Sequence, residues 1–168
     1  MGAASVTRRH ERPIEGPRGR TDCLMFDAVH ELYRWQPKEI AMTDNSGAIT
    51  AALGVLDAFM AAFNARDLPA FEATFNFPSV RLASNRLAIL EKGYHKPEMF
   101  AHGALADWGR SAWDKREVIH AGPDKVHIDT QFTRYRADGT AIASFNSIYV
   151  VTCEDGHWGV KARSSFAP

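Results

Sequence analysis

Two histidine–aspartate pairs are the residues of this 168-residue chain that best fit proton-transfer chemistry. His102 and Asp107 lie on or just after a predicted helix, and His127 and Asp129 lie two apart on a predicted strand. A histidine beside a carboxylate can act as a general acid–base couple, because the histidine pKa lies near neutrality. Residues at i and i+2 of a strand share one face of the sheet, so His127 and Asp129 are predicted to lie together.

The strand over residues 125–136 shows which of the two pairs can reach an interior. Its apolar face carries Val126, Ile128 and Phe132, whereas His127 and Asp129 lie on the opposite face with Gln131. We therefore expect that pair to face solvent or a partner subunit. His102 with Asp107 remains the candidate catalytic couple, and the plain alternative is that His102 is an ordinary surface or core residue.

Strand parity also predicts a set of polar side chains on the inner face of the sheet. This set contains two arginines, a threonine and an asparagine: Arg81, Thr130, Arg134 and Asn146. Two guanidinium groups facing one cavity can hold a carboxylate or phosphate in a bidentate manner. Alternatively, each arginine is neutralised by a nearby acid (Glu72, Glu91 or Asp107) or reaches the rim, where water hydrates it.

Aromatic side chains are the candidates for the apolar wall of such a cavity. They are Phe59, Phe63, Trp108 and Phe132. They can line a small apolar ligand, or they can simply fill a core, which is the commoner role of such stripes.

The elements that must position these residues follow from periodicity and turn chemistry. An apolar stripe predicts a helix over 48–64, Asp67 caps a second short helix, and Lys96-Pro97-Glu98 opens a third. A short strand over 79–83 returns over 87–90. Asp138-Gly139 and Asp155-Gly156 are turn signals between the long strands predicted at 113–120, 125–136, 141–153 and 158–166. The predicted fold class is α+β, a curved antiparallel sheet wrapped over three helices in one domain, 48–168.

Residues 1–47 differ in composition from the rest of the chain. Several arginines lie there among Pro and Gly with few apolar residues, which predicts a largely disordered arm with a possible short helix over 24–35. The arm can be a docking helix or basic tether, or a plain extension ahead of a domain that opens near Met42.

The composition excludes several classes of partner. Lys+Arg and Asp+Glu both number 20, so no overall charge recruits nucleic acid or an anionic membrane. Cys23 and Cys153 show no metal-ligand spacing and cannot build a disulfide framework. We expect no apolar run of the chain to be long enough to span a membrane. We expect a cytoplasmic protein without metal, cofactor, nucleic-acid or membrane partner.

Three stretches carry a resemblance to a known family. They are Phe63-Asn64-Ala65-Arg66-Asp67, Phe77-Pro78-Ser79-Val80-Arg81, and Asp155-Gly156 with Trp158 followed by Ala162-Arg163-Ser164-Ser165-Phe166. With the order of elements, they make the chain from about 48 to 168 resemble the nuclear transport factor 2-like (NTF2-like) superfamily, including its SnoaL-like domains. The resemblance implies a cystatin-like cone with a pocket between sheet and helices, and commonly a homodimer formed through the outer sheet face.

Known catalytic sets of that superfamily map onto inert residues. The tyrosine, base and late acid of ketosteroid isomerases fall near Phe59, near Ala83, and on Asn146 or Ile148. The arginine and aspartate of limonene-type epoxide hydrolases fall on Thr130 and Phe132. These mechanisms are therefore not expected in this chain.

We therefore expect the cone to bind a small, partly apolar ligand whose acidic group is held by Arg81 and Arg134. One alternative is a SnoaL-like lyase or isomerase, of dehydratase or cyclase type, that uses His102 and Asp107. A second alternative is a structural homodimer whose cavity is filled by side chains.

Overall fold

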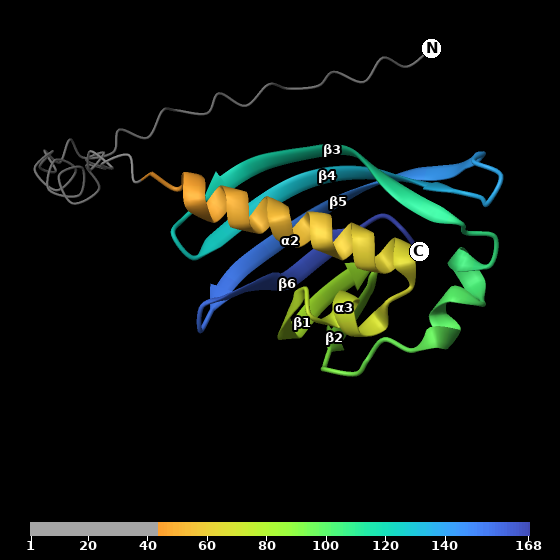
Figure 1. The fold of residues 1–168 in the computed structure, drawn as a ribbon, viewed down its shortest axis with the longest axis horizontal. Coiled ribbons are helices and arrows are strands. Elements are labelled where there is room, and N and C mark those ends of the chain that lie inside the picture. The colour runs from red at the N-terminus through yellow and green to blue at the C-terminus, as the bar shows by residue number, and fades with distance from the viewer. Residues whose placement is uncertain (1–43) are drawn as a thin grey trace, which may run out of the picture. The chain divides into compact units, whose positions relative to one another are not determined.

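The structure is a computed structural model that describes residues 44–168. The predictions for the first 43 residues, including the helix over 24–35, lie outside this range. The first described element is the long helix α2 (Ser46–Ala65), which lies along the inner face of a six-stranded sheet (Figure 1). Its buried positions recur at three- and four-residue steps and confirm the predicted stripe: Ala48, Ala52, Leu56, Phe59 and Ala62.

A second, shorter helix follows α2 after a tight break. Arg66 takes a left-handed conformation with φ of 57° and ends α2. Asp67 then caps α3 (Leu68–Glu72), because its Oδ1 accepts the amide proton of Ala70 at 3.0 Å. This cap is the one that the sequence predicts.

The sheet has the strand order β2-β1-β6-β5-β4-β3. Its strands are β1 (Phe75–Ala83), β2 (Arg86–Leu90), β3 (Arg110–Ala121), β4 (Lys125–Tyr135), β5 (Ala141–Glu154) and β6 (His157–Ser165). All predicted strands are present, and β1 starts earlier than the predicted Ser79. Neighbours are antiparallel except β1 and β6, which run parallel. The sheet is thus not purely antiparallel.

The predicted third helix is wrong. Residues 97–105 form two separate 3-10 turns, Pro97–Phe100 and Gly103–Leu105. His102 between them is extended, and Gly103, the first residue of the second turn, has a φ of +62° in the left-handed region, so no continuous α-helix runs through this segment. The sheet therefore wraps over two helices and these two turns.

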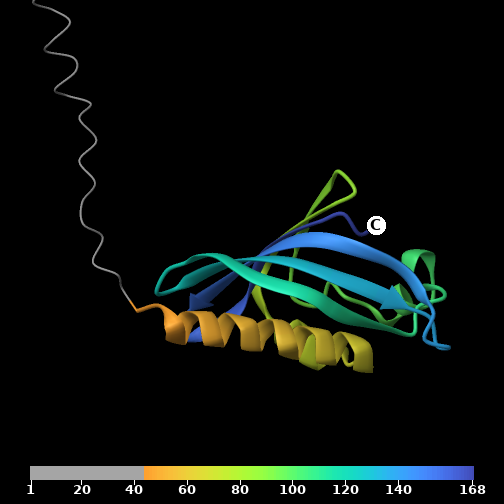
Figure 2. The same cartoon turned by 90° about the horizontal axis from the view of Figure 1, so that it is seen from above.

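Figure 2 shows the strands bowed over α2, as expected for an α+β cone. The core fills the space between α2 and the middle of the sheet, where Leu56, Val126, Ile128, Val151 and Val160 are almost completely buried. Toward the end where α2 meets α3, the packing opens into a cavity.

By length and composition alone, α2 also passes as a candidate membrane span. This differs from the expectation that no apolar run of the chain would be long enough. One such helix is weak evidence, because the core helix of a soluble protein passes the same test. Here the buried stripe of α2 packs against the sheet.

Candidate functional site

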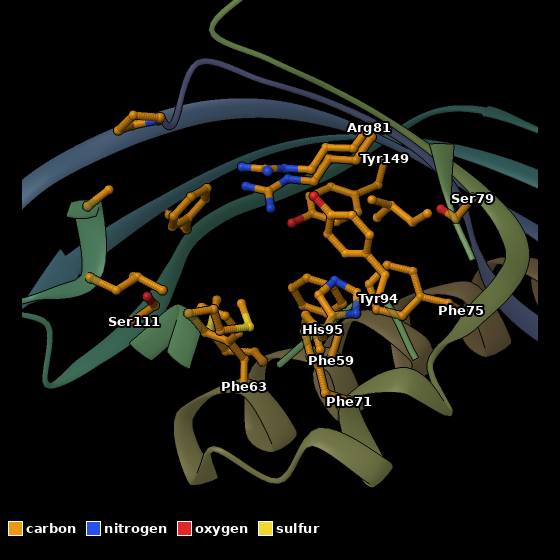
Figure 3. Close-up of a pocket in the computed structure, with 18 of the residues that line it drawn as sticks. Phe59, Phe63, Phe71, Phe75, Ser79, Arg81, Tyr94, His95, Ser111 and Tyr149 are labelled. Atoms are coloured by element: carbon orange, nitrogen blue, oxygen red, sulfur yellow. The ribbon is translucent and has the colours of Figure 1, made fainter. Parts of the chain in front are cut away.

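A cavity of about 490 Å³ lies between the inner face of the sheet, the two helices and the 3-10 turns. Its volume is within the range of pockets that bind small molecules. The helix side is apolar, since Phe59, Phe63 and Phe71 cover it, and Phe75 of β1 continues this wall (Figure 3). The sheet side is polar and cationic. The cavity therefore has two chemically different sides.

Three arginines, Arg81, Arg134 and Arg163, line the sheet side. Arg81 of β1 is the direct partner of Arg163 in the parallel pairing with β6, and Arg163 is in turn opposite Tyr149 of β5. Residues opposite each other on neighbouring strands have side chains in contact distance, so two guanidinium groups are held side by side. Arg134 of β4 completes the group: its guanidinium carbon lies 6.0 Å from the centre of the Phe132 ring, and that of Arg163 lies 5.4 Å from the same ring.

None of the three arginines forms an ion pair within residues 44–168. Arg163 donates from Nη2 to Ser165 Oγ at 3.0 Å, and Arg134 donates from Nη1 to the carbonyl of Ala104 at 3.3 Å. The Nε atoms of Arg134 and Arg163 are buried without any hydrogen-bond partner. Since buried donors are usually paired, these two are available to a ligand.

The electrostatics of the cavity favour an anion. Burial, together with the charges of Arg163 and Arg81, lowers the pKa of Arg134 to about 10, and burial and Arg163 also lower the pKa of Arg81. Both guanidinium groups are still charged at neutral pH. Burial raises the pKa of Tyr149 although the arginines oppose this effect, so its hydroxyl group stays protonated and can donate a hydrogen bond.

A histidine–glutamate pair lies in the wall below the arginines. His95 comes from the segment between β2 and the first 3-10 turn, and its ring packs 4.9 Å from that of Phe71 and 5.2 Å from that of Phe75, measured between centroids. Its Nδ1 lies 3.4 Å from Oε1 of Glu72, which is within ion-pair distance but too poorly aligned for a hydrogen bond.

Glu72 is itself fixed by the backbone. Its carboxylate accepts amide protons from Gly93, at 3.0 and 2.9 Å, and from His95, at 3.2 Å. Burial raises the pKa of Glu72, but these hydrogen bonds outweigh it and the pKa is lowered overall. Burial lowers the pKa of His95 and Arg81 lowers it further, against the opposing effect of Glu72. His95 is therefore neutral at pH 7.

Most of the predicted ligand-binding residues line this cavity. The structure places Phe59, Phe63, Arg81, Phe132 and Arg134 in its wall. Trp108 instead packs in a separate buried cluster with Phe100 and Leu105 and donates from Nε1 to Ser111 Oγ. Thr130 is buried on the inner face, but its hydroxyl donates to the carbonyl of Ser147 and it does not line the cavity.

The inward assignment of Asn146 is wrong. Asn146 is exposed on the outer face of β5, where its side-chain oxygen accepts a hydrogen bond from Gln131 at 3.2 Å. The inner face of β5 is formed by the alternate residues, including the buried Ser147 and Tyr149. The exposed Ile148, on the same face as Asn146, carries an apolar side chain that suggests the opposite parity.

The proposed couple of His102 and Asp107 is not assembled. Both residues are exposed; His102 lines the cavity and Asp107 does not. No hydrogen bond or ion pair joins them in the described part of the chain. The outward assignment of His127 and Asp129 is confirmed, because Asp129 pairs with Lys115 at 2.7 Å and neither residue lines the cavity.

Sequence reasoning missed Arg163, Tyr149 and His95. A bulge at Lys161, between the pairs Val150–Ala162 and Val151–Val160, shifts the parity of β6 and hides the inward direction of Arg163. His95 lies in an irregular segment where no periodicity indicates a direction. Tyr149 was missed for the same reason as Asn146, because the apolar but exposed Ile148 suggests the opposite parity on β5.

Residues 44–168 contain no group of three or more His, Cys, Asp or Glu side chains arranged to hold a metal ion. The polar groups available in the cavity are thus mainly guanidinium groups, tyrosine hydroxyls and the two imidazoles of His95 and His102. Such a set suits the binding of an organic anion.

Comparison with solved structures shows the same fold in proteins of low sequence identity. A protein of unknown function with a cystatin-like fold from Nostoc punctiforme has a TM-score of 0.60 at 14% identity, over 71% of this chain and 90% of that chain. An NTF2-like protein of unknown function from Pseudomonas putida has a TM-score of 0.59 at 17% identity, over 73% and 88%. A ketosteroid isomerase-like protein from Erwinia carotovora has a TM-score of 0.54 at 19% identity, over 70% and 93%.

A search of curated proteins finds no significant match to the chain. The family model described as NTF2-like protein (DUF6841) matches residues 48–165, which include every helix, turn and strand of the cone apart from the first residues of α2. The chain therefore belongs to the NTF2-like protein (DUF6841) family.

Proposed function

We propose that the cavity binds a small, partly apolar molecule and that Arg81, Arg134 and Arg163 hold its acidic group. The observation that carries this proposal is that three guanidinium groups share one side of the cavity without an acidic partner among residues 44–168. The acids Glu72, Glu91 and Asp107 form no ion pair with them among the described residues, and Glu72 instead binds the amides of Gly93 and His95. A ligand anion would supply the missing countercharge.

The energetics support an anionic ligand with an apolar body. Like charges directly opposite each other on neighbouring strands are destabilising, so the pairing of Arg81 with Arg163 costs free energy until an anion lies between them. Each hydrogen bond to a charged group contributes about 1.5–3 kcal/mol when it forms in such surroundings. The phenylalanine wall then adds roughly 25 cal/mol for every Å² of apolar ligand surface that it buries.

Phenylacetate tests the proposal against its neutral analogue phenylacetamide, which has the same size and ring. We expect calorimetric titration to show binding of phenylacetate and at least about tenfold weaker binding of the amide. The loss of one charge-assisted hydrogen bond costs about 1.5 kcal/mol or more, and about 1.4 kcal/mol is already a factor of ten in affinity. Arg134→Met should weaken phenylacetate binding by a similar factor or more.

Arg136→Met is the matched control, since Arg136 lies two residues further along the chain but is exposed and outside the cavity. It should leave the affinity unchanged. Equal affinities for phenylacetate and phenylacetamide, or equal effects of the two substitutions, would contradict the role given to the arginines. The open volume of the cavity counts against the alternative of an interior filled by side chains.

We also propose that a second copy of the chain covers the outer face of the sheet. Exposed apolar residues gather there on adjacent strands: Val80 pairs with Ile89 and Leu82 with Leu87, and Ile148 lies opposite Ser164, the β6 partner of Leu82. A contiguous apolar patch of this kind is typical of an interaction surface. The homodimer that the NTF2-like resemblance implies would bury it. With balanced charge, we propose a cytoplasmic protein without nucleic-acid or membrane partners.

A further inference from the structure

His95 presents one ring nitrogen to the cavity. Its Nδ1 is buried beside Glu72. Its Nε2, in contrast, does not belong to the buried atoms that lack a hydrogen-bond partner within residues 44–168. The residue lines the cavity. Glu72 lies 3.4 Å from Nδ1, and its negative charge favours a proton on that nitrogen. A neutral imidazole with its proton on Nδ1 leaves the lone pair of Nε2 free to accept a proton. The pKa of His95 is lowered by burial, so this neutral form predominates at pH 7.

The rest of the cavity complements a proton acceptor at this position. Figure 3 shows His95 and Tyr94 facing the same space as Arg81 and Tyr149. The charge of Arg81 is close enough to lower the pKa of His95, and the rings of Tyr94 and His95 are 5.4 Å apart between centroids. A ligand held by the arginines would thus have a base on one side and cationic donors on the other, the arrangement needed to make and stabilise an enolate.

We propose that His95, positioned by Glu72, is the general base of an enzyme that removes a proton from the carbon next to the ketone of a small apolar keto acid. This inference rests on the proposed function, because the arginines must first hold the acid. It replaces the couple of His102 and Asp107, which the structure does not assemble.

The step needs no co-reactant. Nε2 of His95 takes the proton, and the electron pair of the broken C–H bond forms a carbon–carbon double bond while the carbonyl π pair moves onto oxygen. The resulting enolate oxygen is stabilised by the guanidinium groups and by the Tyr149 hydroxyl. The N–H of the imidazolium ion exchanges with solvent, and the ion then delivers a solvent proton to carbon, which gives isotope exchange, or a proton to oxygen, which gives the enol.

Phenylpyruvate in D₂O tests this step, since it combines a ring, a carboxylate and an acidic benzylic position beside a ketone. The wild-type protein should accelerate the loss of the benzylic proton signal in NMR spectra above the rate in buffer. His95→Gln should lower the protein-dependent rate by about 100-fold or more, which is the usual range for a general base. His95→Phe, which keeps an aromatic ring packed on Phe71 and Phe75, provides a second variant if the first folds poorly.

Glu72 is a positioning residue, and a pH profile distinguishes its role from a structural one. The groups that face His95 are Glu72 from α3, Arg81 from β1 and the neighbouring Tyr94. Glu72→Gln removes the negative charge that raises the pKa of His95, so the inflection of the exchange rate should move to lower pH while binding of phenylpyruvate persists. His120→Gln, on the exposed outer face, should change nothing.

The outcomes separate the two proposals. If phenylpyruvate binds to the wild type in calorimetry but exchanges no faster than in buffer, the base role of His95 is refuted and the binding function stands. If phenylpyruvate does not bind but phenylacetate does, the role of His95 toward keto acids is refuted and the binding function stands. If neither binds, both are refuted. If His102→Gln abolishes exchange and the His95 variants do not, His95 is the wrong base.

Discussion

Arg134 carries a charge in a place where burial and two neighbouring arginines oppose it. Its side chain is 7% exposed, its Nε has no partner, and its pKa is lowered to about 10. A buried charge without an acidic partner is destabilising, and its retention is typical of a functional site. The cation–π contact with Phe145, at 5.0 Å, offsets part of this cost.

Arg134→Met should therefore stabilise the ligand-free protein, by about 1–2 kcal/mol in urea unfolding, because an apolar side chain of similar length replaces an unpaired charge. The gain should be constant between pH 6 and 9. The folded-state pKa of about 10 is below the ordinary value of 12.5, so the charged form is disfavoured in the folded protein at every pH below 10.

In saturating phenylacetate the order of stability should reverse, since the variant loses the ligand's contribution to folding. Arg136→Met serves again as the exposed control. A loss of stability in the ligand-free variant would show that Arg134 is satisfied within the protein and would argue against an anion site.

At the scale of single residues, the sequence predicts which side chains face inward on strands where apolar and polar positions alternate regularly. Arg81 and Arg134 were placed correctly because Ser79, Ala83, Ile128 and Phe132 mark the buried face. Asn146 was misplaced because Ile148 is apolar yet exposed on the outer face. An apolar residue that covers an outer surface cannot be distinguished from a core residue by sequence.

At the scale of the element, the parallel pairing of β1 with β6 creates the arginine pair. The close approach of β6 to β1 depends on Gly159. An added Cβ there would lie 2.7 Å from Asn76 N and Phe75 C, both backbone atoms of β1. Backbone atoms cannot move aside as a flexible side chain can, so any other residue would push the two strands apart.

Gly159→Ala should destabilise the protein by about 1–3 kcal/mol, the usual cost of overpacking, and should weaken phenylacetate binding because Arg81 moves relative to Arg163. Gly54→Ala is the matched control in the exposed middle of α2, where an added Cβ meets no atom within 4 Å. It should stabilise by up to about 1 kcal/mol, since alanine has the higher helix propensity. Equal effects of the two substitutions in urea unfolding would refute the close approach at Gly159.

The sequence predicted the two α-helices, the hairpin turns and the strands, since caps, apolar stripes and Asp-Gly turns are local signals. It did not predict the parallel pair, because residues about 80 apart in the chain (Arg81 and Arg163) meet there and no local pattern records this. The third helix was wrong because Gly103, in the left-handed region, divides an otherwise helical-looking pattern.

For the whole molecule, the described domain has an apolar patch outside the sheet and a cationic cavity inside it. Light scattering coupled to size exclusion should find a dimer at micromolar concentration. Ile89→Lys should shift it to a monomer, because a lysine would be buried among Val80, Leu82 and Leu87.

Ile119→Lys, at an exposed apolar residue of β3 away from that patch, is the control and should stay dimeric. A wild-type protein that is monomeric at all accessible concentrations would refute the proposed interface. The cavity proposal would be unaffected, since its lining residues come from one chain.

The most direct measurement of the central claim is NMR of the arginine Nε–H groups during titration with phenylacetate. The unpaired Nε–H signals of Arg134 and Arg163 should move in a saturable manner as they donate to the carboxylate, while that of Arg136 stays in place and phenylacetamide produces no such change. Signals of Arg134 and Arg163 that remain fixed, or that move no more than that of Arg136, would contradict the binding of an acid group by these arginines.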